Sequence, residues 1–233
     1  MSTRIERLQA QFDRLSIDSF LVSSASNQQY LAGASVEGGD GYLLVTAKDA
    51  VFITDARYLT ELKATIPDMP LAITRDYLQA ANDHLQAVGA TVLGIEDSLS
   101  LNEYQWLDEH LWTDIVSLAG VVDNLRQIKE PAEIAAIRKA TALTSQGVTA
   151  LFDQLHVGMS ERQAAQWLER WMGDHGSTGT SFDTIVASGK RSAWPHGSAS
   201  DKLLADHDMV TIDCGFYVDG YTSDVTRTVA LGD

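Results

Sequence analysis

The chain has 233 residues, of which 45% are hydrophobic, so it is long enough to bury a sizeable core in one large or two modest domains. Lys and Arg number 17 against 32 Asp and Glu, which gives a formal net charge of −15 at pH 7. A surface this acidic repels phosphate backbones and anionic lipids, so we expect no nucleic-acid partner and no membrane partner.

The first residues, MSTRIERLQAQFDRL, contain no apolar run of the kind that a secretory signal needs. No stretch of the chain approaches the roughly 18 consecutive apolar residues that indicate a membrane-spanning helix. Cys214 is the only cysteine, so no disulfide can form within the chain. Together these features predict a cytoplasmic protein.

The first half of the chain alternates helical and strand patterns. Apolar residues recur at helical spacing from Ile5 to Leu15 and predict an opening helix. Short β-rich runs predict strands at 20–22, 42–45, 51–54, 71–73, 92–95 and 115–116, and helical patterns lie at 58–64, 77–88 and 102–111. This alternation indicates a layered α/β domain, which we place at residues 1–124.

The pattern changes after residue 124. Pro131 suits the first turn of a helix, because its missing N–H is not needed there. Ser160 and Gln163 have the spacing of a capping box, which predicts the start of a second helix. From Phe182 onward the patterns become those of strands. We therefore predict an α+β domain over residues 125–233.

A hairpin signal lies near the end of the chain. Residues 210–231 read VTIDCGFYVDGYTSDVTRTVAL, in which Asp219-Gly220 separates two β-rich runs. Such a dipeptide between strands is among the strongest hairpin signals. With these two residues as the loop, Val218 faces Tyr221 and the pairing continues outward.

This register places two aspartates together. Asp213 faces Thr226, and Asp224 lies two residues before Thr226 on the same strand. Because strand side chains alternate, Asp213 and Asp224 point to the same face as diagonal neighbours. A bulge at Gly215 would change the register, so the deduction holds for a regular hairpin.

Two facing carboxylates repel each other unless protons or cations intervene. Divalent metal ions bridged by both aspartates would satisfy them and activate a water. The alternative is that Thr226 and arginines from elsewhere, such as Arg57 or Arg191, hold the two carboxylates. Arg227 is nearer in sequence but points to the opposite face of a regular strand.

His196 is a second candidate functional residue. Pro195 and Gly197 flank it and suggest a loop near a strand end, where functional side chains are often presented. An imidazole there could donate a proton or hold a substrate carbonyl, although a lone histidine is more often structural or exposed. We interpret the remaining histidines as structural or exposed: His84, His110, His156, His175 and His207.

Taken together, these stretches resemble the pita-bread metallopeptidases, specifically Xaa-Pro dipeptidases (prolidases) and aminopeptidase P. The resemblance is sharpest in 212–215 and 220–228, and it extends to 54–58, 129–133, 182–189 and 195–197. It implies an α/β N-terminal (creatinase/prolidase-type) domain followed by the first part of an α+β pita-bread domain. Methionine aminopeptidases generally lack such an N-terminal domain, and creatinase lacks the metal ligands.

The resemblance also implies a chemistry. Asp213 and Asp224 correspond to the first two ligands of a site for two divalent metal ions (Mn, Co or Zn), and His196 corresponds to a residue that contacts substrate. Thr226 would orient Asp213. The implied activity is metal-dependent hydrolysis of Xaa-Pro bonds near the N-terminus of short peptides, with a proline-containing peptide as substrate. The alternative is a non-catalytic pita-bread binding protein.

The family completes its metal site with a histidine and two glutamates further along than Asp233, where this chain ends. The resemblance therefore implies that the chain carries an incomplete catalytic domain. We expect the chain by itself to be inactive and to bind metal weakly. Strand edges and apolar surface left uncovered would favour self-association or a partner chain that covers them, and we expect a homodimer.

Overall fold

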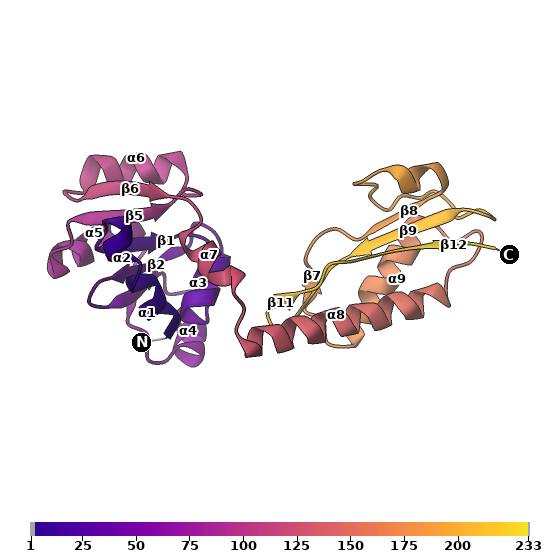
Figure 1. The fold of residues 1–233 in the computed structure, drawn as a ribbon, viewed down its shortest axis with the longest axis horizontal. Helices are drawn as coiled ribbons and strands as arrows, with labels where there is room; N and C mark the ends of the chain where they lie inside the picture. The colour runs from indigo at the N-terminus through magenta and orange to yellow at the C-terminus, as the bar shows by residue number, and fades with distance from the viewer. Residues whose placement is uncertain (1–2, 233) are drawn as a thin grey trace. The chain divides into compact units, whose positions relative to one another are not determined.

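The computed structural model describes residues 3–232, and the chain divides into two compact units, Met1–Ile128 and Lys129–Asp233 (Figure 1). The boundary expected after residue 124 falls inside helix α7 (Val121–Gln127). Val122 of this helix is buried in the core of the first unit, and Arg126 Nη1 donates to Asn27 Oδ1 at 2.9 Å. These contacts keep α7 in the first unit, so the division comes at residue 128.

The first unit is built on one six-stranded sheet in the order β4-β3-β2-β1-β5-β6. Its strands are β1 (Ser19–Val22), β2 (Gly41–Thr46), β3 (Ala50–Thr54), β4 (Leu71–Ile73), β5 (Val92–Glu96) and β6 (Asp114–Leu118). β2 runs antiparallel to β1 and β3, whereas the pairs β3–β4, β1–β5 and β5–β6 are parallel. The six strands predicted from the sequence are confirmed.

Helices cover both faces of this sheet. They are α1 (Thr3–Gln9), α2 (Phe12–Leu15), α3 (Ala25–Ala32), α4 (Leu59–Thr65), α5 (Tyr77–Val88), α6 (Leu101–His110) and α7. One core lies between the sheet and α1, α2, α3, α4 and α7, and a second core lies between the opposite face and α5 and α6. The unit is therefore a layered α/β domain, as predicted. The prediction of one opening helix from Ile5 to Leu15 was wrong, because the chain turns at residues 10–11 and forms two helices, α1 and α2.

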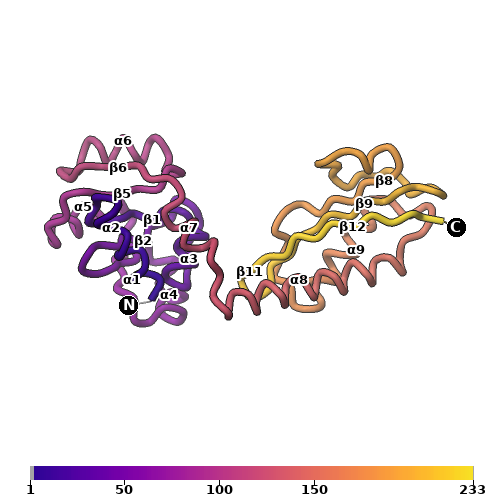
Figure 2. Tube along the Cα trace, viewed as in Figure 1, coloured from indigo at the N-terminus to yellow at the C-terminus, as the bar shows by residue number. Residues whose placement is uncertain are grey.

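The second unit combines two helices with two small antiparallel sheets. Figure 2 traces the path of the chain through β8, β9 and β12. The sheets have the orders β12-β9-β8 and β11-β10-β7. The elements are α8 (Pro131–Phe152), α9 (Glu161–Asp174), β7 (Gly179–Thr180), β8 (Ile185–Ser188), η1 (Gly189–Ala193), β9 (Met209–Cys214), β10 (Phe216–Val218), β11 (Tyr221–Thr222) and β12 (Val225–Ala230).

The two helices of this unit begin where the sequence predicts. Pro131 is the first residue of α8. Ser160 caps α9, because its Oγ accepts from Gln163 N at 3.1 Å while the Gln163 side chain accepts from Ser160 N at 2.9 Å. Apolar residues of both helices pack against apolar residues on one face of β8 and β9. Together they form the core, which includes Val148, Leu151, Leu168, Met172, Val186, Val210 and Ile212. Within residues 3–232, no helix is long and apolar enough to span a bilayer.

Candidate functional site

The hairpin near the end of the chain has the predicted register. Val218 pairs with Tyr221, and Asp213 pairs with Thr226. Gly215, between β9 and β10, does not shift the pairing. A Cβ there would lie 2.5 Å from Phe182 Cε1 and closer still to Ser181 Oγ, so only glycine fits without displacing its neighbours.

The two aspartates lie on the side of the hairpin away from the helices. Asp213 is half-buried in β9 between two buried residues, and its Oδ1 accepts from Thr226 Oγ1 at 2.7 Å. Asp224 is exposed directly before β12, between the buried residues Ser223 and Val225. Since neighbouring side chains alternate in extended chain, both carboxylates point away from the core.

The buried thiol of Cys214 is influenced by both carboxylates. Cys214 is fully buried beside Asp213 in β9, on the helix side of the sheet. Burial, and after it the negative charges of Asp213 and Asp224, raise the pKa of this thiol to about 12. The thiol therefore stays protonated at neutral pH, and we interpret it as a packing residue.

Within the described part of the second unit, residues 129–232, no Lys, Arg or His nitrogen lies within ion-pair distance of Asp213 or Asp224. The two arginines considered as partners of the aspartates, Arg57 and Arg191, form ion pairs with other carboxylates. Arg57 forms ion pairs with two aspartates of the first unit, and Arg191 Nε lies 3.1 Å from Glu161 Oε2. Both arginines thus have carboxylate partners of their own, and the predicted contact from the threonine hydroxyl to Asp213 is present.

The pair supplies part of a metal-ligand set. Carboxylate oxygens suit hard and borderline divalent cations, and no cation of the described second unit neutralises either aspartate. The described part of the chain brings together no group of three or more His, Cys, Asp or Glu side chains that could hold a metal ion. Asp213 and Asp224 therefore fit a divalent ion as two of its ligands, and further donors are needed to complete the coordination.

Ser223 and Thr144 hold the chain immediately before Asp224, and no sequence pattern predicted their contact. The two hydroxyls lie 2.6 Å apart, and Phe216 N donates to Ser223 Oγ at 3.1 Å. Thr144 is fully buried in α8. A single serine next to a carboxylate is too common a pattern to predict such a contact, because its partner is distant in sequence.

His196 lies on an exposed turn after η1, as its neighbours Pro195 and Gly197 indicated. Two residues later, Ser198 pairs with Ile185 of β8, and Ile185 pairs on its other side with Asp213 of β9. Ser198 and Asp213 are therefore separated by two strand spacings, roughly 10 Å. The fold thus brings the His196 loop and the aspartate to the same end of one sheet.

The remaining histidines do not join this site. His110 stacks on Trp106 and His175 stacks on Trp171, with ring centroids 4.4 Å and 3.7 Å apart. The ring of His84 lies 3.0 Å from an aspartate of the first unit. His156 and His207 are exposed.

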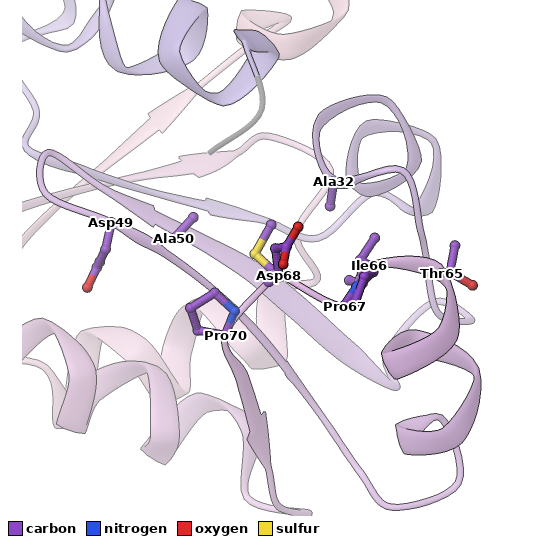
Figure 3. Close-up of a pocket in the computed structure, with 9 residues that line it drawn as sticks. Ala32, Asp49, Ala50, Thr65, Ile66, Pro67, Asp68 and Pro70 are labelled. Carbon is purple, nitrogen blue, oxygen red and sulfur yellow. The ribbon is translucent and has the colours of Figure 1, made fainter.

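A separate hollow of about 500 Å³ lies in the first unit (Figure 3). It is formed mainly by the segment between α4 and β4, and Asp49, which lines it, already contacts His84 and Thr46. Asp68, its other carboxylate, is exposed. The hollow therefore offers no cluster of catalytic or metal-binding groups. Its lining residues are Ala32, Asp49, Ala50, Thr65, Ile66, Pro67, Asp68, Met69 and Pro70.

Comparison with sequence families defines the class of protein. Residues 4–128 match the creatinase/prolidase N-terminal domain, and residues 135–233 match metallopeptidase family M24. The chain therefore belongs to the creatinase/prolidase family, with an M24 metallopeptidase fold in its second unit.

Individual relatives match nearly the whole of this chain. An uncharacterized peptidase of Bacillus subtilis is 35% identical over 98% of this chain and 65% of its own length. The solved Xaa-Pro dipeptidase from Bacillus anthracis superposes with a TM-score of 0.92 at 34% identity, over 99% of this chain and 65% of that one. The X-Pro aminopeptidase from Thermotoga maritima superposes with a TM-score of 0.88 at 28% identity. This match covers 98% of this chain and 65% of the aminopeptidase. The chain thus spans about 65% of the length of these relatives.

Proposed function

We propose that the full-length gene product is a metal-dependent peptidase that hydrolyses Xaa-Pro bonds near the N-terminus of short peptides. The observation that carries this proposal is the pair Asp213 and Asp224, which no cation in the described part of the second unit neutralises and which shares a sheet end with the His196 loop. Family membership supports the choice of substrate, since solved relatives are an Xaa-Pro dipeptidase and an X-Pro aminopeptidase.

Asp213 and Asp224 would hold divalent ions through their carboxylate oxygens. Manganese and cobalt suit oxygen donors at least as well as zinc, and we propose two ions of one of these metals. When bound, such ions polarise a carbonyl group and lower the pKa of a coordinated water. Thr226 would fix the orientation of the Asp213 carboxylate through its 2.7 Å hydrogen bond.

His196 would contact the substrate. Its imidazole is exposed, and within residues 3–232 it has no hydrogen-bond or ion-pair partner that would occupy a ring nitrogen. A neutral imidazole can hold a carbonyl oxygen by donating a hydrogen bond, and it can transfer a proton near neutral pH. Peptide binding beside the two aspartates would therefore place a proton donor next to the scissile bond.

We also propose that the protein is a cytoplasmic homodimer. In the described part of the chain, β12 is an outer strand of its sheet, so its free N–H and C=O groups need cover from further chain or from a partner. Sedimentation velocity of the full-length gene product tests the assembly, and a monomer at micromolar concentration would contradict it.

The activity is tested by assaying Ala-Pro, Ala-Pro-Ala and Ala-Ala with the full-length gene product in the presence of Mn²⁺, Co²⁺ or Zn²⁺. We expect metal-dependent cleavage of the proline peptides, no cleavage of Ala-Ala, and loss of activity in a chelator. The 233-residue chain alone should bind Mn²⁺ weakly and show little turnover, because two carboxylates are too few ligands. A full-length product that binds no metal and cleaves no proline peptide would instead indicate a binding protein.

A further inference from the structure

Glu161, the first residue of α9, has a carboxylate that is fully buried and fully hydrogen-bonded. Its Oε1 accepts from Ser188 N at 2.8 Å and from Ser188 Oγ at 2.9 Å. Its Oε2 accepts from Ser200 N at 3.1 Å and from Ser200 Oγ at 2.6 Å. A buried charge is costly unless it is paired and hydrogen-bonded, and this one meets both conditions.

These bonds close a loop around His196. Ser188 is the last residue of β8 and Ser200 follows the turn that carries His196, so one carboxylate binds both ends of the segment. Arg191, inside the segment, points its Nε to Glu161 Oε2 at 3.1 Å and donates from Nη2 to the Ser198 carbonyl at 2.7 Å. The segment 188–200 is thus held at its start, its middle and its end.

The lowered pKa of Glu161 keeps its carboxylate charged, so its hydrogen bonds persist at neutral pH. Burial raises the pKa of Glu161, but the hydrogen bonds from Ser200 and Ser188 outweigh it, so its pKa lies below the ordinary value. The carboxylate is therefore charged at neutral pH, next to the Arg191 guanidinium. The donors to Glu161 are the main-chain N–H and the hydroxyl of both Ser188 and Ser200. Four such donors suit an ionised carboxylate, which offers acceptor sites on both of its oxygens.

We propose that Glu161 is a positioning residue for His196 and acts through the loop whose two ends it binds. We call the hydrogen bonds of its carboxylate with Ser188 and Ser200 the clasp. The role of His196 in substrate binding is taken from the proposed function, on which this inference rests. The clasp itself is independent of that role. It fixes the path of the loop beside β8, and with it the place from which His196 reaches the substrate.

The clasp is tested by amide hydrogen exchange of the 233-residue chain and its Glu161→Gln variant. Glutamine replaces one acceptor oxygen by a donor, which then faces the donors of Ser188 or Ser200. We expect exchange in residues 188–200 to accelerate at least about tenfold, with β9 and β12 unchanged. The start of α9 should persist, because Glu161 N and Arg162 N donate to the carbonyls of Lys202 and Ser200.

The matched control is Glu169→Gln on the same helix, since the Glu169 side chain has no hydrogen-bond or ion-pair partner in the described part of the second unit. We expect no change in the loop. If Glu161→Gln does not fold, Ser200→Ala removes one donor of the clasp and should accelerate exchange at residues 196–200 alone. Unchanged exchange in the loop would overturn the proposal. Uniform acceleration through the whole second unit would also overturn it, since that would mean a general structural role.

A double-mutant cycle in the full-length gene product tests the link to His196. With Ala-Pro as substrate, Glu161→Gln should lower kcat about tenfold without changing bound Mn²⁺, and it should cause no further loss in a His196→Ala background. Fully additive losses would overturn the positioning role. If the unaltered protein cleaves no proline peptide, the proposed function fails, and the exchange measurement still decides whether Glu161 holds the loop.

Discussion

The two units treat their strand carboxylates in opposite ways. Asp55, directly after β3 in the first unit, is 4% exposed and accepts from Arg57 N at 2.8 Å, Arg57 Nε at 2.9 Å and Tyr77 Oη at 3.0 Å. Asp213, in β9 of the second unit, accepts only from Thr226 among described side chains. A carboxylate matched by its own arginine is a structural anchor. A carboxylate left without a protein cation is available to a metal ion.

The largest expected effect comes from removing the unmatched charges. Asp213→Asn or Asp224→Asn in the full-length gene product should lower Ala-Pro hydrolysis by more than about 100-fold, because a metal ligand is weakened. Without metal, the melting temperature of either variant should stay the same or rise, because repulsion between the two carboxylates is relieved. Kinetics and thermal denaturation in a chelator measure both. Full activity in either variant would show that the ligands are misassigned.

Gly215 tests whether the stability of the hairpin depends on the close approach of its neighbours to the backbone at this position. Gly215→Ala places a methyl group against Phe182, Ser181 and the Ser223 carbonyl, and we expect a loss of about 1–3 kcal/mol in the free energy of unfolding. Chemical denaturation of the 233-residue chain measures this loss. In the control variant Gly173→Ala, nothing lies within 4 Å of the new methyl group, so stability should change by less than about 1 kcal/mol.

Thr226 tests whether the hydrogen bond that orients Asp213 in the second unit contributes to metal binding and activity. Thr226→Val keeps the shape of the side chain but removes the hydroxyl that donates to Asp213, and we expect roughly a tenfold loss of activity or metal affinity. Thr228→Val is the matched control, because its hydroxyl shares a hydrogen bond with Thr211 and contacts no carboxylate. Equal losses in the two variants would mean that orientation of Asp213 is unimportant.

The smallest expected effect concerns pH and the first unit. Hydrogen bonds from Arg57, and after them from Tyr77, hold the pKa of Asp55 well below its ordinary value of 3.8. The stabilisation is therefore complete above 3.8 and is lost as the pH falls toward the lower folded pKa. Asp55→Asn should lower the melting temperature by several degrees at pH 7 and flatten its fall between about pH 5 and pH 2. An unchanged pH profile would contradict the assignment.

The sequence predicted the parts of the fold that depend on local interactions. A two-residue Asp219-Gly220 loop fixes which residues face each other, so the pairing of Asp213 with Thr226 followed from spacing alone. The Ser160 capping box followed from spacing as well. Helix α3 was missed, because its buried residues include Asn27 and Gln28, and no apolar stripe marks it.

Tertiary structure decided which charges are compensated. The sequence by itself determined that Asp213 and Asp224 share a face, because alternation along a strand is a local property. It did not determine that Arg191 lies beside Glu161, or that Glu161 reaches Ser188 and Ser200. Those contacts join residues 27 to 39 positions apart, and only packing of α9 against β8 brings them within hydrogen-bond distance. The metal-binding candidates are therefore readable from the sequence, whereas the support of the His196 loop is a property of the folded chain.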